Sequence, residues 1–317
     1  MKKSHMKWYY LLVIIITFQF QSFSFGSTKI QILNKINNEI ITNFDVEKEY
    51  NYLIALNNDL KNVPENEAFK IAKDSLIREK IKTSELKKFF VIDEFNNTKY
   101  LKNVLKSFYQ KLNLSNEEEF SNYLNSYGLS VDEVKNKIKL EILWNQLIGN
   151  KYKNQINIDV DSLRKKIIKD KLNFANIVEY DLSEIVFQAK TQDELNIKTE
   201  QIKKSINNIG FNNTANKFSI SESAKFGGKI GKIKENQLSN QIKKELQSLK
   251  VNEITNPLNI GGSFLLLFIN DRKEVELKQD EEEILKNMIE FERTKQFDQF
   301  SQVYFNKVKI NVQIENF

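Results

Sequence analysis

The chain has 317 residues, with 48 Lys and Arg against 42 Asp and Glu, a formal net charge of +6, and 40% hydrophobic residues. This length is enough for two folded domains, and 28% charged with 11% aromatic residues fits neither a disordered chain nor a polytopic membrane protein. The chain contains no Cys, which excludes disulfides, thiol nucleophiles, Cys-based zinc sites and iron-sulfur clusters.

The first 26 residues are predicted to be a secretory signal peptide. Three lysines precede the apolar run of residues 8–18, and Ser24 and Gly26 stand at the −3 and −1 places of a cleavage site. The alternative is an uncleaved membrane anchor over residues 8–25, although the apolar run is shorter than the ~20 residues that span a bilayer. Cleavage would remove His5, the single histidine, and would exclude any triad, general base or metal ligand that needs an imidazole.

Two short β-prone runs follow this segment. Residues 29–33 (KIQIL) and 39–42 (EIIT) flank the dipeptide Asn37-Asn38, which tolerates the positive φ of a tight turn. The pattern predicts a β-hairpin.

Residues 43 to about 173 are predicted to be helical. Apolar residues recur three and four positions apart, and charged residues occupy the other faces. Ser115 with Glu118, and Ser130 with Glu133, have the capping-box spacing that marks a helix start. We expect five or six helices here.

The composition changes again near Tyr180, since six of the nine glycines lie between residues 210 and 262. A glycine-dense block with short apolar runs indicates an α+β unit. The elements predicted for it are a strand at 181–187, a helix at 192–208, a short helix at 214–218, a strand at 228–233, a helix at 239–249 and a strand at 264–270.

The last part of the chain returns to a helical pattern. Residues 280–307 are rich in Glu, Lys and Phe and predict a helix, and residues 308–314 (VKINVQI) alternate like a strand. Because both ends of the chain carry such isolated alternation around a helical block, we expect the final strand to pair with the hairpin of residues 29–42.

Three stretches of the α+β unit resemble a parvulin-type peptidyl-prolyl isomerase domain. They are LSEIVF at 182–187, FSISESAKFGGKIGKI at 218–233 and LKVNEITNPLNIGGSFLLLFINDR at 249–272. The shared elements are GG-x-hydrophobic-G and [GN]-E-I-[ST]-x-P. The order of segments along the chain, with the opening KINNEIITNFDVEKE at 35–49, is similar to the SurA family of periplasmic chaperones with a single parvulin domain.

The resemblance implies a multidomain α and α+β fold. A helical chaperone domain would be closed by a small terminal β-sheet, and a parvulin-like α+β domain would be inserted in it. The implied division is a signal peptide at 1–26, the N-terminal part of the chaperone domain at 27–177, the parvulin-like domain at 178–274, and a C-terminal helix and strand at 275–317 that complete the chaperone domain.

The resemblance also locates a candidate site. Active parvulins have a histidine in the first strand, a cysteine or aspartate before the double glycine and a second histidine in the last strand; the matching residues here are Glu184, Ser221 and Leu265. Leu238 and Ile242 match the family's apolar proline pocket. The resemblance therefore implies a retained peptide cradle with weak or lost isomerase activity.

Other interpretations of these polar residues are open. Glu184 is equally consistent with an exposed carboxylate on the outer face of a strand. Ser221, with Ser219 and Ser223, also has the character of a loop or cap residue.

The sequence predicts no cofactor, metal or nucleic acid partner. Gly227-Gly228-Lys229 lacks the spacing of a phosphate loop, so nucleotide binding is not predicted. The acidic runs at 117–119 and 280–283 stand where helices begin, where they favour the helix dipole rather than a metal site. Lysines are spread without the aromatic interleaving typical of nucleic-acid binding.

The predicted function is that of a periplasmic chaperone. It would bind unfolded outer-membrane protein segments in an apolar groove of the helical domain, with the degenerate parvulin domain as a secondary peptide-binding module. The alternative is an active peptidyl-prolyl isomerase with a rearranged polar site. A third interpretation is a membrane-tethered foldase that keeps residues 8–25 as an anchor.

Overall fold

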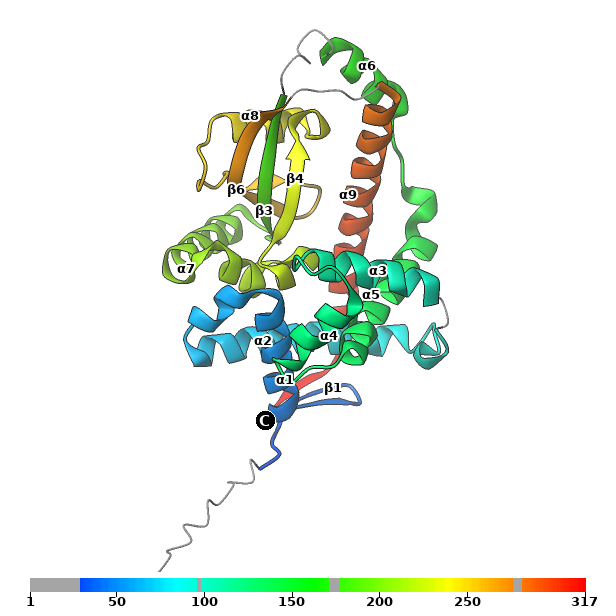
Figure 1. Ribbon diagram of the computed structural model, residues 1–317, viewed down its shortest axis with the longest axis vertical. Helices are drawn as coiled ribbons and strands as arrows, with labels where there is room; N and C mark the ends of the chain where they lie inside the picture. The colour runs from blue at the N-terminus through cyan, green and yellow to red at the C-terminus, as the bar shows by residue number, and fades with distance from the viewer. Residues whose placement is uncertain (1–28, 96–97, 171–176, 276–280) are drawn as a thin grey trace, which may run out of the picture. The chain divides into compact units, whose positions relative to one another are not determined.

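The computed structural model describes residues 29–95, 98–170, 177–275 and 281–317 (Figure 1). Within these ranges the chain forms nine α-helices and two antiparallel sheets. None of the described helices has the length and hydropathy that a membrane span requires. The predicted signal segment lies outside the described residues.

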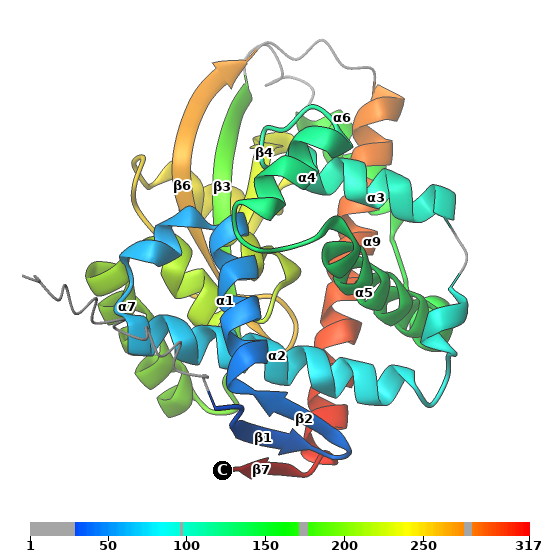
Figure 2. The same cartoon turned by 60° about the horizontal axis from the view of Figure 1, so that its bottom comes forward.

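The smaller sheet joins the two ends of the described chain (Figure 2). Strands β1 (Ile32–Ile36), β2 (Glu39–Thr42) and β7 (Ile314–Asn316) are ordered β2-β1-β7. The turn between β1 and β2 places Asn37 at φ 51°, as its dipeptide predicts. The expected pairing of the hairpin with the C-terminal tail is therefore confirmed.

The predicted position of the last strand is wrong by several residues. The helix α9 runs through Glu281–Ile310, and β7 begins only at Ile314 instead of at residue 308. The physical reason is the packing of Val308, which is buried in the main core together with Tyr304 four residues earlier. This helical spacing overrides the local alternation of the tail.

The stretch of sequence between β2 and the second sheet forms six helices, in agreement with the five or six predicted. They are α1 (Asn43–Leu56), α2 (Glu65–Leu86), α3 (Thr98–Gln110), α4 (Glu117–Asn125), α5 (Val131–Tyr152) and α6 (Val160–Asp170). Short 3₁₀ turns lie between them at η1 (Asn58–Asn62), η2 (Ile92–Glu94) and η3 (Lys153–Gln155).

Several of these helices start at a residue whose side chain caps the helix. Ser130 and Glu133 form the predicted capping box at the start of α5. At α4 the cap is one residue later than predicted, because Asn116 accepts from the Glu119 backbone and the Ser115 N–H donates to the Glu119 carboxylate. Both arrangements satisfy amide groups that a helix start leaves free.

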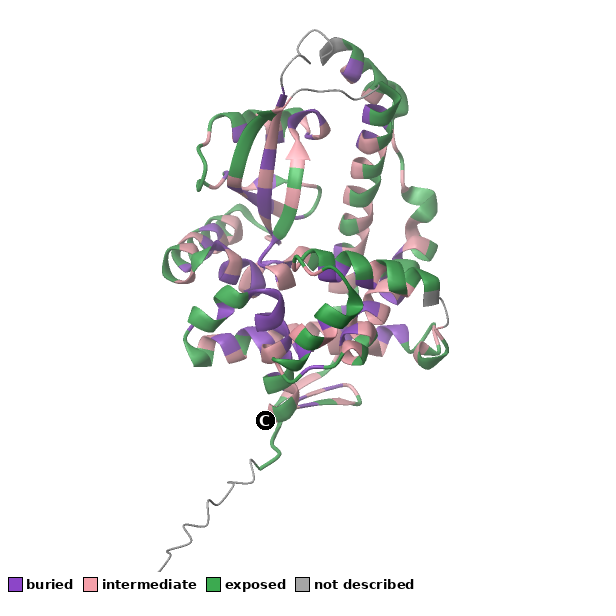
Figure 3. Cartoon of the chain, viewed as in Figure 1, coloured by how far each residue is buried: buried purple, intermediate pink, exposed green. Residues whose placement is uncertain are grey.

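The helical block has one large apolar core, visible as buried segments in Figure 3. Trp144 on α5 is fully buried there and packs against Tyr304 of α9. Its indole Nε1 donates to Ser301 Oγ at 2.8 Å. The C-terminal helix is therefore part of this core, although Trp144 and Ser301 are 157 positions apart in the sequence.

The second sheet forms the parvulin-like unit, with the strand order β4-β3-β6-β5. Its elements are β3 (Ile177–Phe187), α7 (Gln192–Phe218), η5 (Glu222–Phe226), β4 (Lys229–Lys234), η6 (Glu235–Gln237), α8 (Asn240–Gln247), β5 (Leu258–Asn259) and β6 (Phe264–Val275). Gly210, at φ 79°, interrupts α7 close to the predicted end of its first part. Helices α8 and α7 pack on opposite faces of the sheet.

Helix α9 connects the two units through contacts along its length. Ile284 and Met288 near its start pack with Ile167 of α6. Further along, the Gln302 side chain accepts from Ser263 Oγ of the parvulin-like unit, and the Tyr304 hydroxyl donates to the Glu85 carboxylate of α2.

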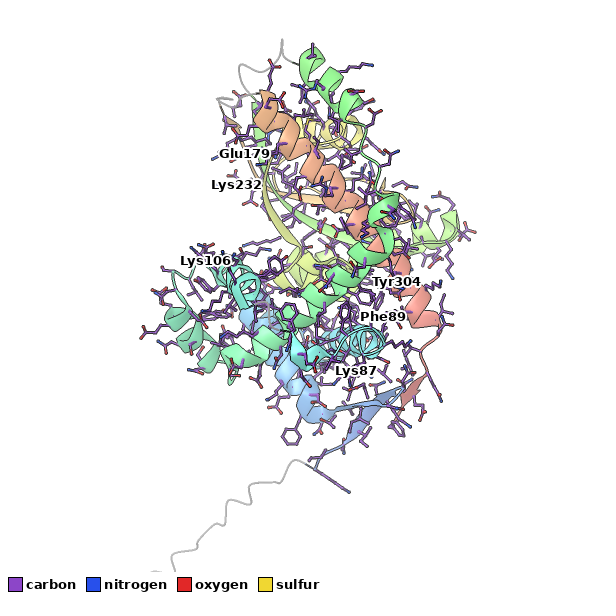
Figure 4. The ribbon with its side chains drawn as sticks, turned by 90° about the vertical axis from the view of Figure 1, so that its right-hand side faces the viewer. Lys87, Phe89, Lys106, Glu179, Lys232 and Tyr304 are labelled. Atoms are coloured by element: carbon purple, nitrogen blue, oxygen red, sulfur yellow. The ribbon has the colours of Figure 1, made fainter. Side chains whose placement is uncertain are left out.

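The end of α9 lies beside the end of α2. Lys151 Nζ lies 4.6 Å from the ring centroid of Phe89 and 4.9 Å from that of Tyr304, the two aromatic residues labelled in Figure 4. Cation-π contacts of this kind add to the aromatic packing. The predicted fold class, a helical domain closed by a terminal sheet plus a parvulin-like α+β domain, is confirmed.

Candidate functional site

Glu184 lies in the central strand of the parvulin-like sheet. Its even-numbered neighbours Leu182 and Val186 belong to the apolar cluster under α8, so Glu184 faces the same side of β3. Leu267 of β6 is its cross-strand partner. The carboxylate therefore interrupts an otherwise apolar face.

Two serine hydroxyls bind this carboxylate. Ser221 Oγ and Ser223 Oγ donate to Glu184 Oε1 at 2.5 and 2.8 Å. Burial raises the pKa of Glu184, while these two hydrogen bonds lower it. The side chain is half-buried and bonded, which differs from the exposed outer-face carboxylate considered as an alternative.

Gly228 sets the position of the serine-containing loop beside β3. Its φ is +79°, and a Cβ at this position would lie 2.3 Å from the Glu184 carbonyl oxygen. The Glu184 N–H donates to the Gly228 carbonyl at 2.8 Å, and the Gly228 N–H donates to the Ser223 carbonyl at 2.9 Å. Only glycine allows this close backbone approach, so the double glycine has a structural role at this site.

The three apolar candidate residues lie together in one buried cluster. Leu238, Ile242 and Leu265 are 2, 6 and 7% exposed and belong to the core between α8 and the sheet. The structure thus forms two groups, a polar one of Glu184 with Ser221 and an apolar one of these three. The apolar group is filled by its own side chains, and its role in binding proline stays a prediction.

A partly open cavity of about 160 Å³ lies next to the serine-containing loop. Residues of α1, α2, α5, the segment 220–225 and α9 line it. Nine of its nineteen lining residues are charged, so this cavity is not the apolar groove that the sequence predicted.

Two lysines hold most of the acidic groups of this cavity. Lys82 Nζ lies 2.7 Å from Glu141 Oε2 and 2.6 Å from Glu222 Oε1. Lys137 Nζ lies 2.6 Å from Glu49 Oε2 and also bonds the Glu79 carboxylate. Sequence reasoning missed these residues, because each one has the helical spacing of an ordinary solvated face.

The pKa values of Glu141 and Glu222 are shifted in opposite directions. Burial and the nearby Glu222 carboxylate raise the pKa of Glu141. Burial alone would raise the pKa of Glu222 as well, but Lys225 and Lys82 together lower it well below its ordinary value. Opposite pKa shifts of this kind are common for neighbouring carboxyl groups that interact.

Asp298 of α9 is the titrating group of the cavity near neutral pH. Surrounding protein, followed by the nearby Glu184 and Glu222, raises the pKa of Asp298 from its ordinary value of 3.8 to about 7. The folded protein therefore holds this proton more tightly than the unfolded chain. The stabilisation that the proton gives is complete below about pH 3.8 and is lost as the pH rises to about 7.

Replacing Asp298 by Asn should therefore make stability less dependent on pH. We expect the free energy of unfolding of Asp298→Asn, relative to that of the wild type, to be higher at pH 8 than at pH 5. The effect should be modest because the side chain keeps an exposed surface. Urea unfolding at both pH values measures this. The control Asp132→Asn changes an aspartate that is 90% exposed; an equal pH response in both variants would contradict the assignment.

The described residues contain no His or Cys, and none of their groups of acidic side chains could hold a metal ion. Rotation of a prolyl bond needs no nucleophile, since its barrier of ~18–20 kcal/mol comes from amide resonance.

Residues 181–271 match the rotamase family described as the PPIC-type PPIASE domain. The chain is 25% identical over 167 residues to chaperone SurA of Pseudomonas putida, covering 49% of this chain and 38% of that protein. It is 23% identical over 162 residues to chaperone SurA of Pectobacterium atrosepticum, covering 49% of this chain and 37% of that protein. The match thus spans less than two fifths of the length of these relatives.

Solved structures were compared as well. A structure described as one of two SurA-like chaperones of Campylobacter jejuni has 16% identity and a TM-score of 0.35, and the match covers 90% of this chain and 98% of that one. The foldase protein PrsA of Streptococcus pneumoniae has 13% identity and a TM-score of 0.28, with coverage of 90% and 95%. Residues 181–271 thus match the PPIC-type peptidyl-prolyl isomerase family, and about half of the chain is similar to SurA chaperones.

Proposed function

We propose that this protein is a periplasmic chaperone that binds unfolded or extended segments of outer-membrane proteins. The PPIC-type domain acts in it as a peptide-binding module rather than as an efficient isomerase. The observation that carries this proposal is the polar centre of the domain, where Glu184 bonds to Ser221 and Ser223 while Leu265 is buried in the apolar cluster. The fold of the domain is kept and the family's histidines are absent.

The loss of the imidazole pair bears directly on catalysis. Fixed polar groups around the substrate carbonyl stabilise the rotating amide, and removing one such donor from an enzyme site costs ~2.7–4 kcal/mol. Glu184 Oε1 accepts hydrogen bonds from two serine hydroxyls. In its ionised form this carboxyl group has no donor for a prolyl carbonyl.

The proposal keeps the division of the chain inferred from the sequence. A signal peptide at 1–26 is removed on export, residues 27–177 and 275–317 form the chaperone domain, and residues 178–274 form the parvulin-like domain. Two observations support it: β3 starts at Ile177 and β6 ends at Val275. The core contacts of Tyr304 and Val308 support assigning the last helix to the helical block.

Suppression of aggregation tests the chaperone proposal. We expect an equimolar amount of the full chain to reduce the light scattering of a urea-unfolded porin after dilution, without ATP, because extended aromatic clients gain ~25 cal/mol for each Å² of apolar surface that they bury. A folded protein of similar size and charge serves as the control. No suppression by a chain that circular dichroism shows to be folded would overturn the proposal.

The same preparation separates the chaperone from the alternative, an active isomerase. Prolyl turnover of a tetrapeptide should be about 100-fold or more below that of a histidine-containing parvulin. A wild-type rate equal to that of such a parvulin would favour the isomerase. The sequence predicts no pH dependence between about 5.5 and 8; Asp298, with its pKa of about 7, is the group in the structure that would introduce one.

The membrane-tethered alternative has a separate test. N-terminal sequencing of the exported protein should begin near residue 27, and the protein should be found in the soluble periplasmic fraction. A protein that starts before residue 8 and sediments with the membranes would instead favour a retained anchor.

A further inference from the structure

Two hydrogen-bond donors in the cavity have no acceptor. Across the described parts of the chain, neither the Arg78 guanidinium nor the Tyr52 hydroxyl makes a hydrogen bond or ion pair, and both residues line the cavity. Their polar atoms are not among those sealed inside the protein, so both donors are accessible from the open side of the cavity. A guanidinium carries five N–H donors and accepts nothing, so a ligand that binds it must supply acceptor atoms.

The surroundings keep both donors in the form that can bind an anion. Burial lowers the pKa of Arg78, with Asp74 and Glu49 opposing this shift, yet a guanidinium stays charged in proteins. Burial raises the pKa of Tyr52 to about 12, so its hydroxyl keeps its proton at neutral pH. Lys225 adds a third source of donors, since its ammonium group has three N–H groups and donates to Glu222 Oε2 at 3.0 Å.

Among the described residues, Arg78 is the cation of this cavity that has no carboxylate partner. The four cations of the cavity are Arg78, Lys82, Lys137 and Lys225, and its five acidic residues are Glu49, Glu79, Glu141, Glu222 and Asp298. Glu49 and Glu79 are paired with Lys137, and Glu141 and Glu222 are paired with Lys82. The Asp298 carboxyl group, with its pKa of about 7, is partly protonated at neutral pH.

An apolar wall lies next to these donors. Leu140 of α5, Ile220 before η5 and Phe305 of α9 line the same cavity. A planar carboxylate matches the fork of an arginine side chain, and an attached apolar group would have a surface to pack on. A free amine is disfavoured there, because it would have to approach Arg78 and Lys225.

We infer that this cavity binds the C-terminal carboxylate of an extended polypeptide whose last side chain is apolar. Arg78 binds the carboxylate with its fork, the Tyr52 hydroxyl donates to one carboxylate oxygen, and the last side chain packs against Leu140, Ile220 and Phe305. This inference rests on the proposed binding of extended polypeptides and specifies which part of such a chain is recognised.

Fluorescence anisotropy with three peptides tests the inference on the full chain at pH 7. The peptides are eight residues long, carry fluorescein at the N-terminus and share one sequence, apart from a single glutamate in the third. One ends in phenylalanine as the free acid, the second ends in phenylalanine amide, and the third is an amide with glutamate before the phenylalanine. We expect the free acid to bind at least tenfold more tightly than both amides, because charged hydrogen bonds exceed neutral ones in strength.

Variants identify the residues responsible. Arg78→Gln should abolish the difference between acid and amide, and Tyr52→Phe, which removes one oxygen atom, should reduce it several-fold. The control Arg293→Gln changes an exposed arginine paired with Glu290 and should leave the difference unchanged. Thermal melts show whether each variant is folded. If Arg78→Gln does not fold, the loss of acid preference in Tyr52→Phe becomes the test of the site.

The outcomes separate this site from the proposed function. Equal binding of acid and amide would overturn the carboxylate site while leaving polypeptide binding intact. Binding of the glutamate-containing amide as tightly as the free acid would overturn the assignment to a chain terminus. Failure of all three peptides to bind, together with no suppression of porin aggregation, would overturn the proposed function as well.

Discussion

Replacing Lys137 by alanine is expected to lower the free energy of unfolding by about 3–5 kcal/mol. The ammonium group lies 2.6 Å from Glu49, whose side chain is only 2% exposed, and it also bonds the Glu79 carboxylate. Ser75 Oγ donates to Glu49 at 2.6 Å, but this neutral group cannot balance the charge. The variant would leave a buried carboxylate without its cation.

Several features make Lys137 sensitive to this change. Burial alone would lower the pKa of Lys137, but Glu49 and Glu79 raise it above the ordinary value, so the side chain is charged at every pH at which the protein is handled. It also lies 4.8 Å from the centroid of the Tyr52 ring. Removal of the side chain therefore also opens space beside the cavity.

Urea unfolding at pH 7 measures the effect. The matched control is Lys48→Ala, because Lys48 is paired with Glu133 at the surface, where its side chain is 65% exposed, and such pairs contribute about 0–1 kcal/mol. The double variant Lys137→Ala with Glu49→Gln should recover part of the loss, since it removes the uncompensated charge. Equal destabilisation by Lys137→Ala and Lys48→Ala would show that the buried pair contributes no more to the free energy of unfolding than the surface pair.

Much of the secondary structure could be predicted because local rules decide it. The Asn37 turn and the capping box of Ser130 with Glu133 depend on residues within four positions of each other. The interruption of α7 at Gly210 follows from a backbone conformation that other residues rarely adopt. Local signals of this kind can be read from one sequence without an alignment.

The last strand could not be placed because two local patterns compete in the tail. Residues 308–314 alternate as a strand would, yet Val308 is four residues from Tyr304 and both contact the main core. Ile310, at the end of the helix, is 80% exposed and contributes nothing to either choice. Tertiary packing, which the sequence does not display, decides where α9 ends.

The candidate site could likewise be predicted only in part. Glu184 and Ser221 could be singled out by resemblance to a family, and the structure places their side chains in contact. The cavity that contains Arg78 could not, because its walls come from five segments between residues 49 and 306. A lysine or glutamate on a helix has the same sequence signature whether it faces water or a buried partner.

Deleting the C-terminal strand is expected to destabilise the helical block as a whole. Backbone bonds join Asn37 N–H to the Gln313 carbonyl and Phe317 N–H to the Leu33 carbonyl, each at 3.0 Å. The buried Asn34 donates from Nδ2 to Asn316 Oδ1 at 2.6 Å. With the ladder of β1 and β7, about four bonds of about 0.5–1.5 kcal/mol each would be lost, or about 2–6 kcal/mol in total.

Two truncations separate the strand from the end of the helix. Removing residues 311–317 deletes β7 alone, whereas removing residues 308–317 also deletes Val308, which packs in the main core. We expect the melting temperature to fall in both and to fall further in the longer deletion, by about 2–4 °C for each kcal/mol lost in a chain of this size class.

The control for both truncations is Ile310→Ser, since this side chain is 80% exposed and surface changes usually stay within about 0.5 kcal/mol. Calorimetry of the full chain and the three variants gives the comparison. Because β1 is the central strand of the β2-β1-β7 sheet, loss of β7 turns it into an edge and leaves Asn34 Nδ2 without its acceptor. A truncated chain that melts at the temperature of the full chain would mean that the pairing of the two ends adds nothing to the stability of the helical block.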